Sequence, residues 1–573
     1  MATIHREAVL HIPLSQYAFA DSERSLVIRL RAAKENLRSC VLHYGDRACR
    51  QNPVVFSRAA MSIVACDELF DYFEARLEDV YSRVCYYFEL DAGEESLCYY
   101  GDLFENKLPL ERSEFYQYPF IRREEIPDVP AWFKEAVVYN IFPDSFASDH
   151  RSIQPPERAT AGAKLGGTLR GILRNLDYIQ EMGITCVYLN PIFAAGEYHK
   201  YDTLDYYHID PSLGTDDDFV ELVEALHRRG MRIVLDGVFN HCSWNFFAFE
   251  DVVQKGQDST YVDWFYGLEF PVVRPEDGES IPNYICFAYE RKMPKLNTSH
   301  PEVRAYFMDV CRHWIRRYHI DGWRLDVANE VDREFWREFR RTAKEEDSDC
   351  VLIAEIWESA ESWLRGDMFD SSMNYDFRKN CRDFFAEGVL DAAEFDARIA
   401  RMHLRYPTAI VQGQLNLLDS HDVSRFLSLC GGDQRRFRLA VLFLLCAPGV
   451  PSVFYGDECG MMGVKEAEYR APMPWGREDT PLRRFFAEVT QLRRYPSVIT
   501  GSYHTLAACK GESLYAFRRT LPGESLTVVL NAGEERVLLP NGMPAEAPFF
   551  ASGIADGKLD AFGYAVWLEQ EAR

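Results

Sequence analysis

Four acidic residues in the middle of the chain stand at or just after the ends of short apolar runs. Asp236 follows the run 231–235, Asp326 ends IDGWRLD, Glu355 ends VLIAE and Asp422 follows QLNLLDSH. Asp and Glu are poor strand formers, so local propensity does not account for acids at four such places. Carboxylates gathered at one edge of a sheet can act as acids, bases or nucleophiles, and this pattern predicts an active site.

Asp326 and Glu355 end consecutive predicted strands. Neighbouring strands lie about 4.7–4.9 Å apart, so their carboxylates can be about 5–5.5 Å apart, the spacing of a retaining glycosidase with one nucleophile and one acid/base. An inverting pair needs about 6.5–9.5 Å. Arg324 precedes Asp326 by two residues and shares its strand face. We expect this cation to keep Asp326 ionised, as a nucleophile requires, although it could equally form a structural salt bridge.

Two histidines flank two of these acids. His241 follows Asp236 by five residues, and His421 directly precedes Asp422. A single histidine is usually structural, but two beside the predicted carboxylates favour hydrogen bonding to sugar hydroxyls. Neither has metal-ligand spacing, so we predict no zinc site.

These residues need a scaffold that brings strand ends together. Helical stretches, such as 171–182 and 216–229, alternate with apolar runs at 137–142, 184–189, 231–239, 320–327, 351–357, 414–418 and 450–455. This alternation indicates a parallel sheet. About eight such units favour a (β/α)₈ barrel, in which catalytic groups follow the strands. We predict a barrel domain at 126–490, with an inserted subdomain after the third strand at about 240–298.

The segments before and after the predicted barrel have a different pattern of apolar and polar residues. Short, partly alternating runs at 25–30, 40–44 and 84–90 are separated by turn residues, which predicts an N-terminal β-sandwich at 1–125. Runs at 513–518, 526–530 and 565–568 predict a second β-sandwich at 491–573. The predicted fold is therefore multidomain, with a central barrel between two sandwiches.

The charge excludes some partners. The chain has 573 residues, with 64 basic and 89 acidic side chains and a net charge of −25. Such a chain repels phosphate backbones and anionic lipids, so we expect neither nucleic acid nor a membrane surface as a main partner. The fifteen cysteines are scattered without a CxxC pair, and no signal peptide or long apolar run is found. These features favour a reducing cytoplasm.

Several motifs, in order, resemble the α-amylase family of glycoside hydrolases. The signature regions are 236–241 (DGVFNH), 322–330 (GWRLDVANE), 354–357 (AEIW) and 418–422 (LDSHD), with 166–172 (GGTLRGI), 199–203 (HKYDT) and 449–460 (GVPSVFYGDECG) also fitting. The stretch MPKLN at 293–297 and the continuation VANE resemble the neopullulanase, cyclomaltodextrinase and maltogenic amylase group. DELFDYFEA at 67–75 is similar to that group's additional N-terminal domain.

The resemblance implies a role for each matching residue. Asp326 would be the nucleophile, Glu355 the general acid/base, and Asp422 would stabilise the transition state together with His421. Glu330 would face the leaving-group side. The other implied substrate-binding residues are Tyr201, His199, His241, Arg324, Trp357, Phe287 and Arg470. For Phe287 and Trp357, core packing is the alternative to a sugar platform.

Three departures from the family pattern concern cations and sugar subsites. Many members bind calcium through an NGD-type loop and a GGDL aspartate, but here the loop reads ASDH at 147–150 and Thr168 replaces the aspartate. Because hard cations need several oxygen ligands, we predict that this calcium site is absent or weak and that no cofactor is required. Glu468 replaces an aspartate and Glu358 a histidine, which affects the sugar subsites on either side of the cleaved bond.

The resulting hypothesis is an endo-acting α-glucan hydrolase that uses cyclodextrins, maltooligosaccharides and pullulan, with some transglycosylation. The resemblance also implies a homodimer in which each N-terminal domain covers the partner's active site and narrows its cleft. One alternative is an exo-acting α-glucosidase or oligo-1,6-glucosidase of the same fold, against which MPKLN and the N-terminal domain argue. Another is a non-catalytic sugar-binding scaffold, against which the three retained acids argue.

Overall fold

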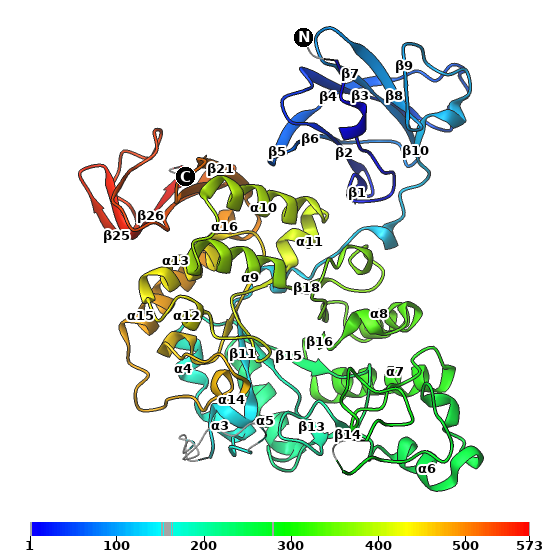
Figure 1. The fold of residues 1–573 in the computed structure, drawn as a ribbon, viewed down its shortest axis with the longest axis vertical. Coiled ribbons are helices and arrows are strands. Elements are labelled where there is room, and N and C mark those ends of the chain that lie inside the picture. The colour runs from blue at the N-terminus through cyan, green and yellow to red at the C-terminus, as the bar shows by residue number, and fades with distance from the viewer. Residues whose placement is uncertain (1–2, 150–152, 154–161, 163, 278–279, 572–573) are drawn as a thin grey trace.

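The fold was analysed in a computed structural model of the chain. It describes residues 3–149, 153, 162, 164–277 and 280–571 (Figure 1). His150 of the predicted ASDH loop lies outside these residues. Within the described part of the chain, no helix is long and apolar enough to cross a membrane.

Eight parallel strands close into a barrel at the centre of the molecule, as the sequence predicts. Their residues are buried except Arg232, which begins β15 and is exposed. In order around the barrel the strands are β11 (Val138–Ile141), β12 (Cys186–Leu189), β15 (Arg232–Gly237), β16 (Gly322–Leu325), β17 (Val351–Ala354), β18 (Ser371–Asn374), β19 (Leu415–Leu417) and β20 (Val450–Phe454). Burial on both faces explains why seven of them read as continuous apolar runs.

Strand β18 has no apolar run and was not identified from the sequence. Its residues, SSMN, are fully buried. Ser372 donates from Oγ to Gln414 Oε1 at 2.8 Å, and Asn374 donates from Nδ2 to Asn416 Oδ1 at 2.8 Å. These bonds across to the β19 side satisfy the polar groups inside the barrel, so a strand forms where hydrophobicity gives no signal.

Helices surround the barrel, and local sequence signals mark where several of them begin. Thr215 and Asp218 form a capping box at the start of α5, and Pro301 occupies the first turn of α7. The expected helix at 171–182 is divided at Asn175. The helices are α1 (Ala131–Glu135), α2 (Pro143–Phe146), α3 (Leu169–Arg174), α4 (Leu176–Glu181), α5 (Asp216–Arg228), α7 (Pro301–Tyr318), α8 (Arg333–Glu346), α9 (Tyr375–Cys381), α10 (Ala392–Leu404), α11 (Thr408–Gly413), α12 (Phe426–Leu429), α13 (Gln434–Cys446), α14 (Glu466–Tyr469), α15 (Pro481–Val489) and α16 (Pro496–Thr500).

The chain between β15 and α7 forms the expected insertion. It contains α6 (Phe247–Lys255) and returns to the barrel through isolated bridges that join His241 to Lys295 and Phe265 to Leu296. A hairpin of β13 (Phe193–Ala195) and β14 (Thr203–Ile209) precedes it in the chain. The insertion and the hairpin extend from one end of the barrel (Figure 1).

Two antiparallel sheets form the N-terminal domain. Alternate residues such as Leu26, Ile28, Tyr86 and Phe88 meet in a core of their own. One sheet contains β1 (Ala18–Ser22), β2 (Ser25–Ala33), β6 (Phe70–Leu77) and β5 (Ser62–Cys66). The other contains β4 (Ser57–Ala60), β3 (Ser39–Asp46), β7 (Val84–Asp91), β8 (Ser96–Tyr100), β9 (Leu103–Glu105) and β10 (Tyr116–Tyr118).

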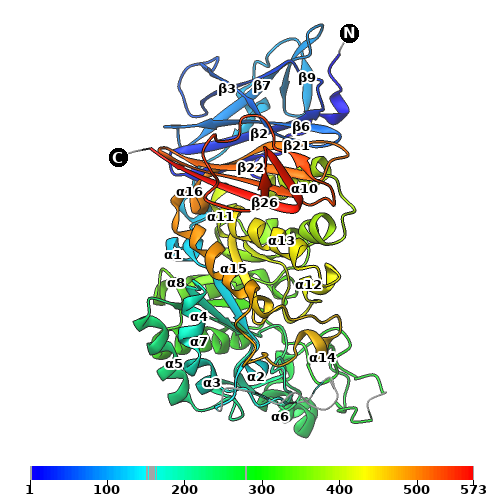
Figure 2. The same cartoon turned by 90° about the vertical axis from the view of Figure 1, so that its left-hand side faces the viewer.

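This domain packs at the end of the barrel where the strands begin. Arg29 donates to the carbonyl of Leu404 at 3.0 Å, and Arg365 donates to the carbonyl of Leu14 at 3.3 Å. Leu404 ends α10, and Arg365 lies before the start of β18. Figures 1 and 2 show the domain at one end of the molecule and α14 and α6 near the other. The domain therefore lies far from the carboxyl ends of its own barrel strands.

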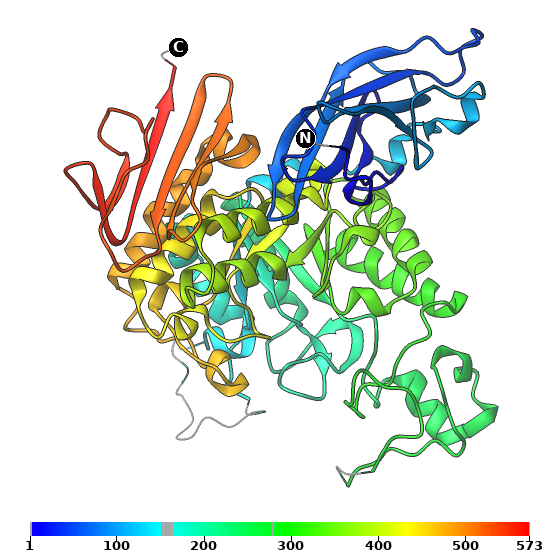
Figure 3. The ribbon, with the colours of Figure 1, turned by 45° about the horizontal axis from the view of Figure 1, so that its top comes forward.

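The C-terminal part is strand-rich, as predicted, and lies beside the N-terminal domain (Figure 3). Its strands are β21 (Ser502–Ala508), β22 (Leu514–Leu521), β23 (Glu524–Asn531), β24 (Val537–Leu538), β25 (Phe550–Ala555) and β26 (Lys558–Gln570). They form one hydrogen-bonded network in which the long β26 pairs with β23, β24 and β25. Phe517 packs on Phe443 of α13, whereas Ala516 and Trp567 belong to a small separate core.

We predict that Gly366→Ala loosens the contact between the N-terminal domain and the barrel. Gly366 has φ +94, and an added Cβ would lie 3.1 Å from the carbonyl carbon of Glu125 and 3.2 Å from the carbonyl oxygen of Glu124. A left-handed alanine costs about 1–2 kcal/mol, and contact with backbone adds to that cost. Gly557→Ala is the matched control, because Gly557 has φ +67 with open space around it. The melting temperature of G366A should fall further than that of G557A; equal decreases would contradict the interface effect.

Candidate active site

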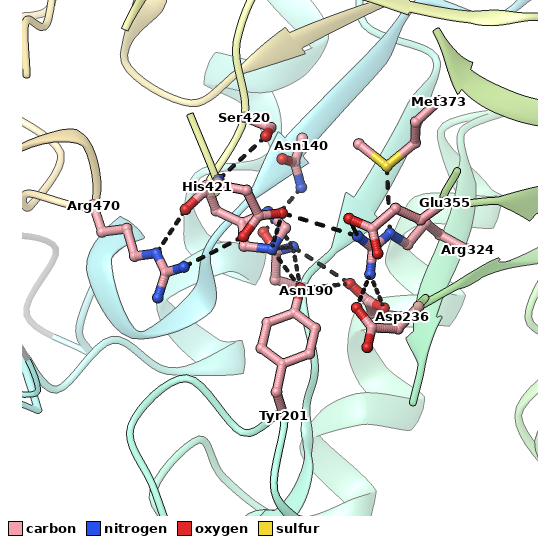
Figure 4. Close-up of polar contacts among 12 residues, drawn as sticks. Asn140, Asn190, Tyr201, Asp236, Arg324, Glu355, Met373, Ser420, His421 and Arg470 are labelled. Carbon is pink, nitrogen blue, oxygen red and sulfur yellow. Dashed lines mark hydrogen bonds and ion pairs between the residues drawn. The ribbon is translucent and has the colours of Figure 1, made fainter. Parts of the chain in front are cut away.

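Arg324 of β16 is the centre of the candidate site. Its guanidinium is fully buried and surrounded by carboxylates (Figure 4). Nη1 donates to Asp236 Oδ1 and to Asp326 Oδ1, both at 2.8 Å, and Nη2 forms an ion pair with Glu355 Oε1 at 2.6 Å. Asp422 Oδ2 lies 4.0 Å from Nη2. The structure thus brings together all four acids that the sequence places at strand ends.

Asp326 and Glu355 occupy equivalent positions on adjacent strands. Each directly follows its strand, and β16 pairs with β17 up to Leu325 and Ala354. The N–H of Asp326 donates to the Gly237 carbonyl, and the N–H of Glu355 donates to the Leu325 carbonyl, both at 3.0 Å. The parallel hydrogen bonding therefore continues one residue past each strand, and both carboxylates are carried by rigid backbone.

Val327 links the two carboxylates through a strained backbone. Its φ of +45 is left-handed, an unfavourable conformation for a β-branched residue. In this conformation its N–H donates to Glu355 Oε2 at 3.0 Å. Trp357 Nε1 donates to the other oxygen, Oε1, at 3.3 Å. Strain of this kind concentrates at functional sites, where surrounding structure enforces it.

Asp236 has a supporting position. It is 1% exposed, and Oδ2 accepts hydrogen bonds from Tyr188 Oη at 2.7 Å and Tyr201 Oη at 3.0 Å, while Oδ1 accepts from Arg324. With both oxygens occupied, Asp236 orients the arginine rather than facing the cleft.

Asp422 is held by His421 and Arg470. His421 Nε2 lies 3.0 Å from Asp422 Oδ2, and Arg470 Nη2 donates to Asp422 Oδ1 at 3.4 Å. Asn190 Nδ2 donates to His421 Nδ1 at 2.9 Å, which leaves the proton of the neutral ring on Nε2. Arg470 also donates from Nε to the His421 carbonyl at 2.7 Å. The Tyr201 ring stacks on His421, with centroids 5.5 Å apart.

Burial and mutual repulsion raise the pKa values of these carboxyl groups. Burial, followed by the Glu355 charge, raises the pKa of Asp326 well above its usual range, and Arg324 opposes this shift. Burial also raises the pKa of Asp236. Burial and the Glu355 charge raise the pKa of Asp422 to about 7. Arg324 lies where the sequence places it, but its attraction does not cancel the larger effect of burial on Asp326.

Of the two remaining site histidines, His241 is fully buried and His199 is partly buried. Burial, together with the Lys295 charge, lowers the pKa of His241 to about 3, and its ring stacks on Phe287 at 4.8 Å. Burial and the Arg470 charge lower the pKa of His199 to about 4. His199 Nδ1 accepts from the Tyr201 N–H at 3.0 Å. Both rings are therefore neutral at pH 7, and Phe287 covers His241.

Trp357 and Glu330 lie on the exposed side of the acids. Trp357 is 52% exposed and stacks on Tyr375, with centroids 4.2 Å apart. Glu330 is exposed. Lys295 Nζ donates to the backbone carbonyl of Glu330 at 2.8 Å and also to Asn240 Oδ1. Trp357 thus presents a free ring face beside Glu355, which core packing does not explain.

Glu468 and Glu358, which depart from the family pattern, accept hydrogen bonds from neighbouring groups of the chain. Glu468 Oε2 accepts from the N–H groups of Val464 and Lys465 at 2.9 and 3.1 Å, so it stabilises its own loop. Glu358 Oε1 accepts from Asn329 Nδ2 at 2.8 Å. Arg470, two residues after Glu468, reaches the site.

Several site residues were missed from the sequence. They are Tyr188, Asn190, Tyr375 and Lys295. Tyr188 and Asn190 stand at the end of β12, two residues apart and on one strand face, so they occupy the same kind of strand-end position as the acids. Applying the same rule to uncharged polar residues finds both of them.

Near the first barrel strand, the described side chains of Thr168, Asp149 and Asp144 already have partners. Thr168 accepts from the Gly171 N–H as the cap of α3, and its hydroxyl donates to Asp149 Oδ1 at 2.6 Å. Asp144 accepts from the N–H groups of Leu165 and Gly166. The available carboxylates are thus engaged with backbone and hydroxyl donors, and the described residues contain no cluster of acidic, histidine or cysteine side chains suited to a metal.

Comparison with known proteins gives the family. Residues 140–491 match the alpha amylase catalytic domain, and residues 4–122 match the alpha amylase N-terminal ig-like domain. The chain belongs to the α-amylase family. It is 44% identical to neopullulanase 2 of Thermoactinomyces vulgaris over 93% of this chain and 92% of that protein. It is 39% identical to a cyclomaltodextrinase of Geobacillus thermopakistaniensis (strain MAS1) over 95% and 94%.

A solved cyclomaltodextrinase has the same architecture, with a TM-score of 0.91 and 35% identity over 98% of this chain and 99% of that one. This α-amylase family chain is therefore a glycoside hydrolase with the predicted combination of domains.

We predict that Asp422→Asn stabilises the protein at neutral and higher pH. The folded state keeps a proton on Asp422 up to a pKa of about 7, whereas an ordinary aspartate releases it near 3.8. Ionisation of this group therefore lowers folded stability as pH rises through that interval. Asparagine has no such ionisation, so the melting temperature of D422N minus that of the wild type should increase from pH 5 to pH 8.

Asp433→Asn is a control of opposite sign, because hydrogen bonds from Arg435 lower the pKa of Asp433. It should lose stability relative to the wild type at neutral pH. A D422N difference that does not change with pH would contradict the assignment for Asp422.

Proposed function

We propose that the protein is a retaining, endo-acting α-glucan hydrolase that opens cyclodextrins and cleaves maltooligosaccharides and pullulan. The observation that carries this proposal is the attachment of Asp326 and Glu355 to adjacent nitrogens of Arg324, at 2.8 and 2.6 Å. A shared guanidinium favours the close spacing of about 5–5.5 Å found in retaining enzymes over the wider one that accommodates a water. The names of two relatives, neopullulanase 2 and a cyclomaltodextrinase, support pullulan and cyclodextrins as substrates.

In the proposed mechanism, Glu355 carries the proton of the first step and donates it to the glycosidic oxygen. Asp326 attacks the anomeric carbon and forms a glycosyl-enzyme. Water, activated by Glu355, then releases the sugar; a sugar hydroxyl in its place gives transglycosylation. Asp422, held by His421 and Arg470, stabilises the cationic sugar ring of the transition state.

The surrounding residues lie on the two sides of the glycosidic bond that would be cleaved. Tyr201 stacks on His421 and, with His199, His241 and Phe287, lines the side of the glycosyl group. Trp357 offers its exposed face to the leaving-group sugar, and Glu330 lies on the same side beside Lys295.

We also propose a calcium-independent homodimer in the cytoplasm. The N-terminal domain lies at the opposite end of the barrel from its own acids, so only a second copy could bring such a domain over the cleft. All fifteen cysteines are free, which supports a reducing compartment.

Two substitutions test the catalytic roles. Asp326→Asn should reduce hydrolysis of both maltotriose and α-maltosyl fluoride by about 10⁴-fold or more, because the nucleophile is lost. Glu355→Gln should suppress maltotriose hydrolysis. With the fluoride, whose leaving group needs no proton, it should still release a rapid burst of fluoride before turnover slows, because the glycosyl-enzyme lacks the base that activates water.

Binding of maltotetraose to D326N, measured by calorimetry, checks that the site remains intact. Absence of a rapid fluoride burst in E355Q would contradict its role as the acid. Binding by the wild type without any hydrolysis would favour the non-catalytic scaffold, and release of glucose only from chain ends would favour the exo-acting alternative.

Substrate choice is tested by initial rates on β-cyclodextrin and soluble starch with a chelator present. A narrowed, calcium-independent site predicts a much faster rate on cyclodextrin. Faster cleavage of starch would contradict the proposal that a second N-terminal domain covers the cleft. Activity only after addition of calcium would contradict the prediction, made from Thr168, that the calcium site is absent or weak.

A further inference from the structure

Two buried aspartates lie at the base of the loop that presents His421 and Asp422. Asp419 comes shortly after β19 and is 3% exposed, and Asp457 comes shortly after β20 and is 4% exposed. Neither belongs to the cluster around Arg324. Asp419 Oδ2 accepts from the Phe426 N–H at 2.7 Å. Asp419 Oδ1 is buried and receives no N–H or conventional O–H donor among the described residues.

Asp457 can supply the missing donor. Its Oδ1 accepts from Arg425 Nη1 at 3.0 Å and its Oδ2 accepts from the Phe454 N–H at 3.3 Å. Asp457 and Asp419 are close enough to interact directly, and a hydrogen bond shared between their carboxyl groups would satisfy Asp419 Oδ1, which is unpartnered among the described residues. An ionised carboxylate is only an acceptor, so two carboxyl groups can form this bond only when one of them is protonated.

The charges around the pair support one proton on Asp457. Arg425, fully buried, contacts Asp457 directly, and the Asp419 charge partly offsets the burial that lowers the pKa of Arg378 of α9. Glu458, next to Asp457, adds a negative charge and accepts hydrogen bonds from Tyr139 and Tyr178. Burial and the Asp419 charge raise the pKa of Asp457 well above its usual range, and Arg425 opposes this only in part.

The same groups fix both ends of the loop. Arg425 lies over the Phe454 ring at 4.0 Å and donates to the carbonyls of Tyr455 and Tyr469 at 2.7 and 3.1 Å. Asp419 begins the segment and holds the N–H of Phe426 beyond it. His421 and Asp422 lie between these two anchors, so a change in the pair displaces them.

We propose that Asp457 carries a proton that it donates to Asp419, and that this hydrogen bond, together with Arg425, positions the loop bearing His421 and Asp422. Asp419, Asp457 and Arg425 are thus positioning residues. The expected effect on rate rests on the proposed function of Asp422, whereas the protonation itself does not.

Infrared spectroscopy tests the proton without any substrate. The wild type at pH 7 should show the carbonyl stretch of a buried carboxylic acid that disappears in Asp457→Asn. Asp433→Asn is the control, because Asp433 is ionised in the wild type and its replacement should leave this region unchanged. Identical acid bands in the wild type and D457N would overturn the proposal, whatever the enzyme hydrolyses.

Kinetics tests the positioning. Asparagine at 457 can donate to Asp419 and accept from Arg425, losing only the long bond from Phe454, so D457N should keep kcat within about threefold of the wild type. Asp457→Ala leaves the Asp419 oxygen without a donor and Arg425 without its carboxylate. A shift of the loop of about 1 Å should lower kcat about 10- to 100-fold, with a smaller change in KM for maltotriose.

Equal losses of kcat in D457N and D457A would overturn the positioning role. An unchanged kcat in both variants would overturn it as well. Absence of hydrolysis by the wild type would instead refute the proposed function, and the infrared comparison would still decide the protonation.

Discussion

Arg324 carries a positive charge at a point with no exposed surface, and the arrangement of the site depends on how that charge is neutralised. Burying one ion costs several kcal/mol, and an ion pair offsets that cost only with good geometry. The barrel supplies the geometry through register: Asp236 of β15 is the direct partner of Arg324 of β16, and Asp326 and Glu355 each follow the last paired residues of their strands. A one-residue slip of β16 would turn Arg324 to the other face and separate the three acids.

The same geometry explains which parts of the site the sequence predicts. Asp326, Glu355 and Asp422 stand at the ends of apolar runs, so a rule about strand ends finds them without knowledge of their contacts. Strand β18 is not predicted from the sequence because its residues are polar. Their hydrogen bonds to Gln414 and Asn416 exist only in the folded barrel. Tyr188 and Asn190 are not predicted for another reason. Their role comes from hydrogen bonds to Asp236 and His421, which are distant in the sequence.

The protonation of the site is less predictable than its composition. From the sequence, Arg324 next to Asp326 suggests an ionised nucleophile. In the fold, three further carboxyl groups share that arginine, and burial raises the pKa values of Asp236, Asp326 and Asp422. Pairwise spacing gives no measure of either effect, because both depend on how many like charges the closed barrel brings together and how much water it excludes. The proton of such a cluster belongs to the group as a whole.

The site therefore opposes folding locally, and the rest of the chain has to stabilise it. Repelling carboxyl groups and the left-handed Val327 each raise the energy of the folded state, whereas the large core around the barrel lowers it. Among the described residues, the hydrogen bonds of Arg29 and Leu14 join the N-terminal domain to this framework at the end where the strands begin. It can stabilise its own barrel there, but it cannot shape its own cleft. In the proposed homodimer, any selectivity that this domain gives for small substrates would therefore arise between two copies of the chain, and it would be lost on dissociation even with every catalytic contact intact.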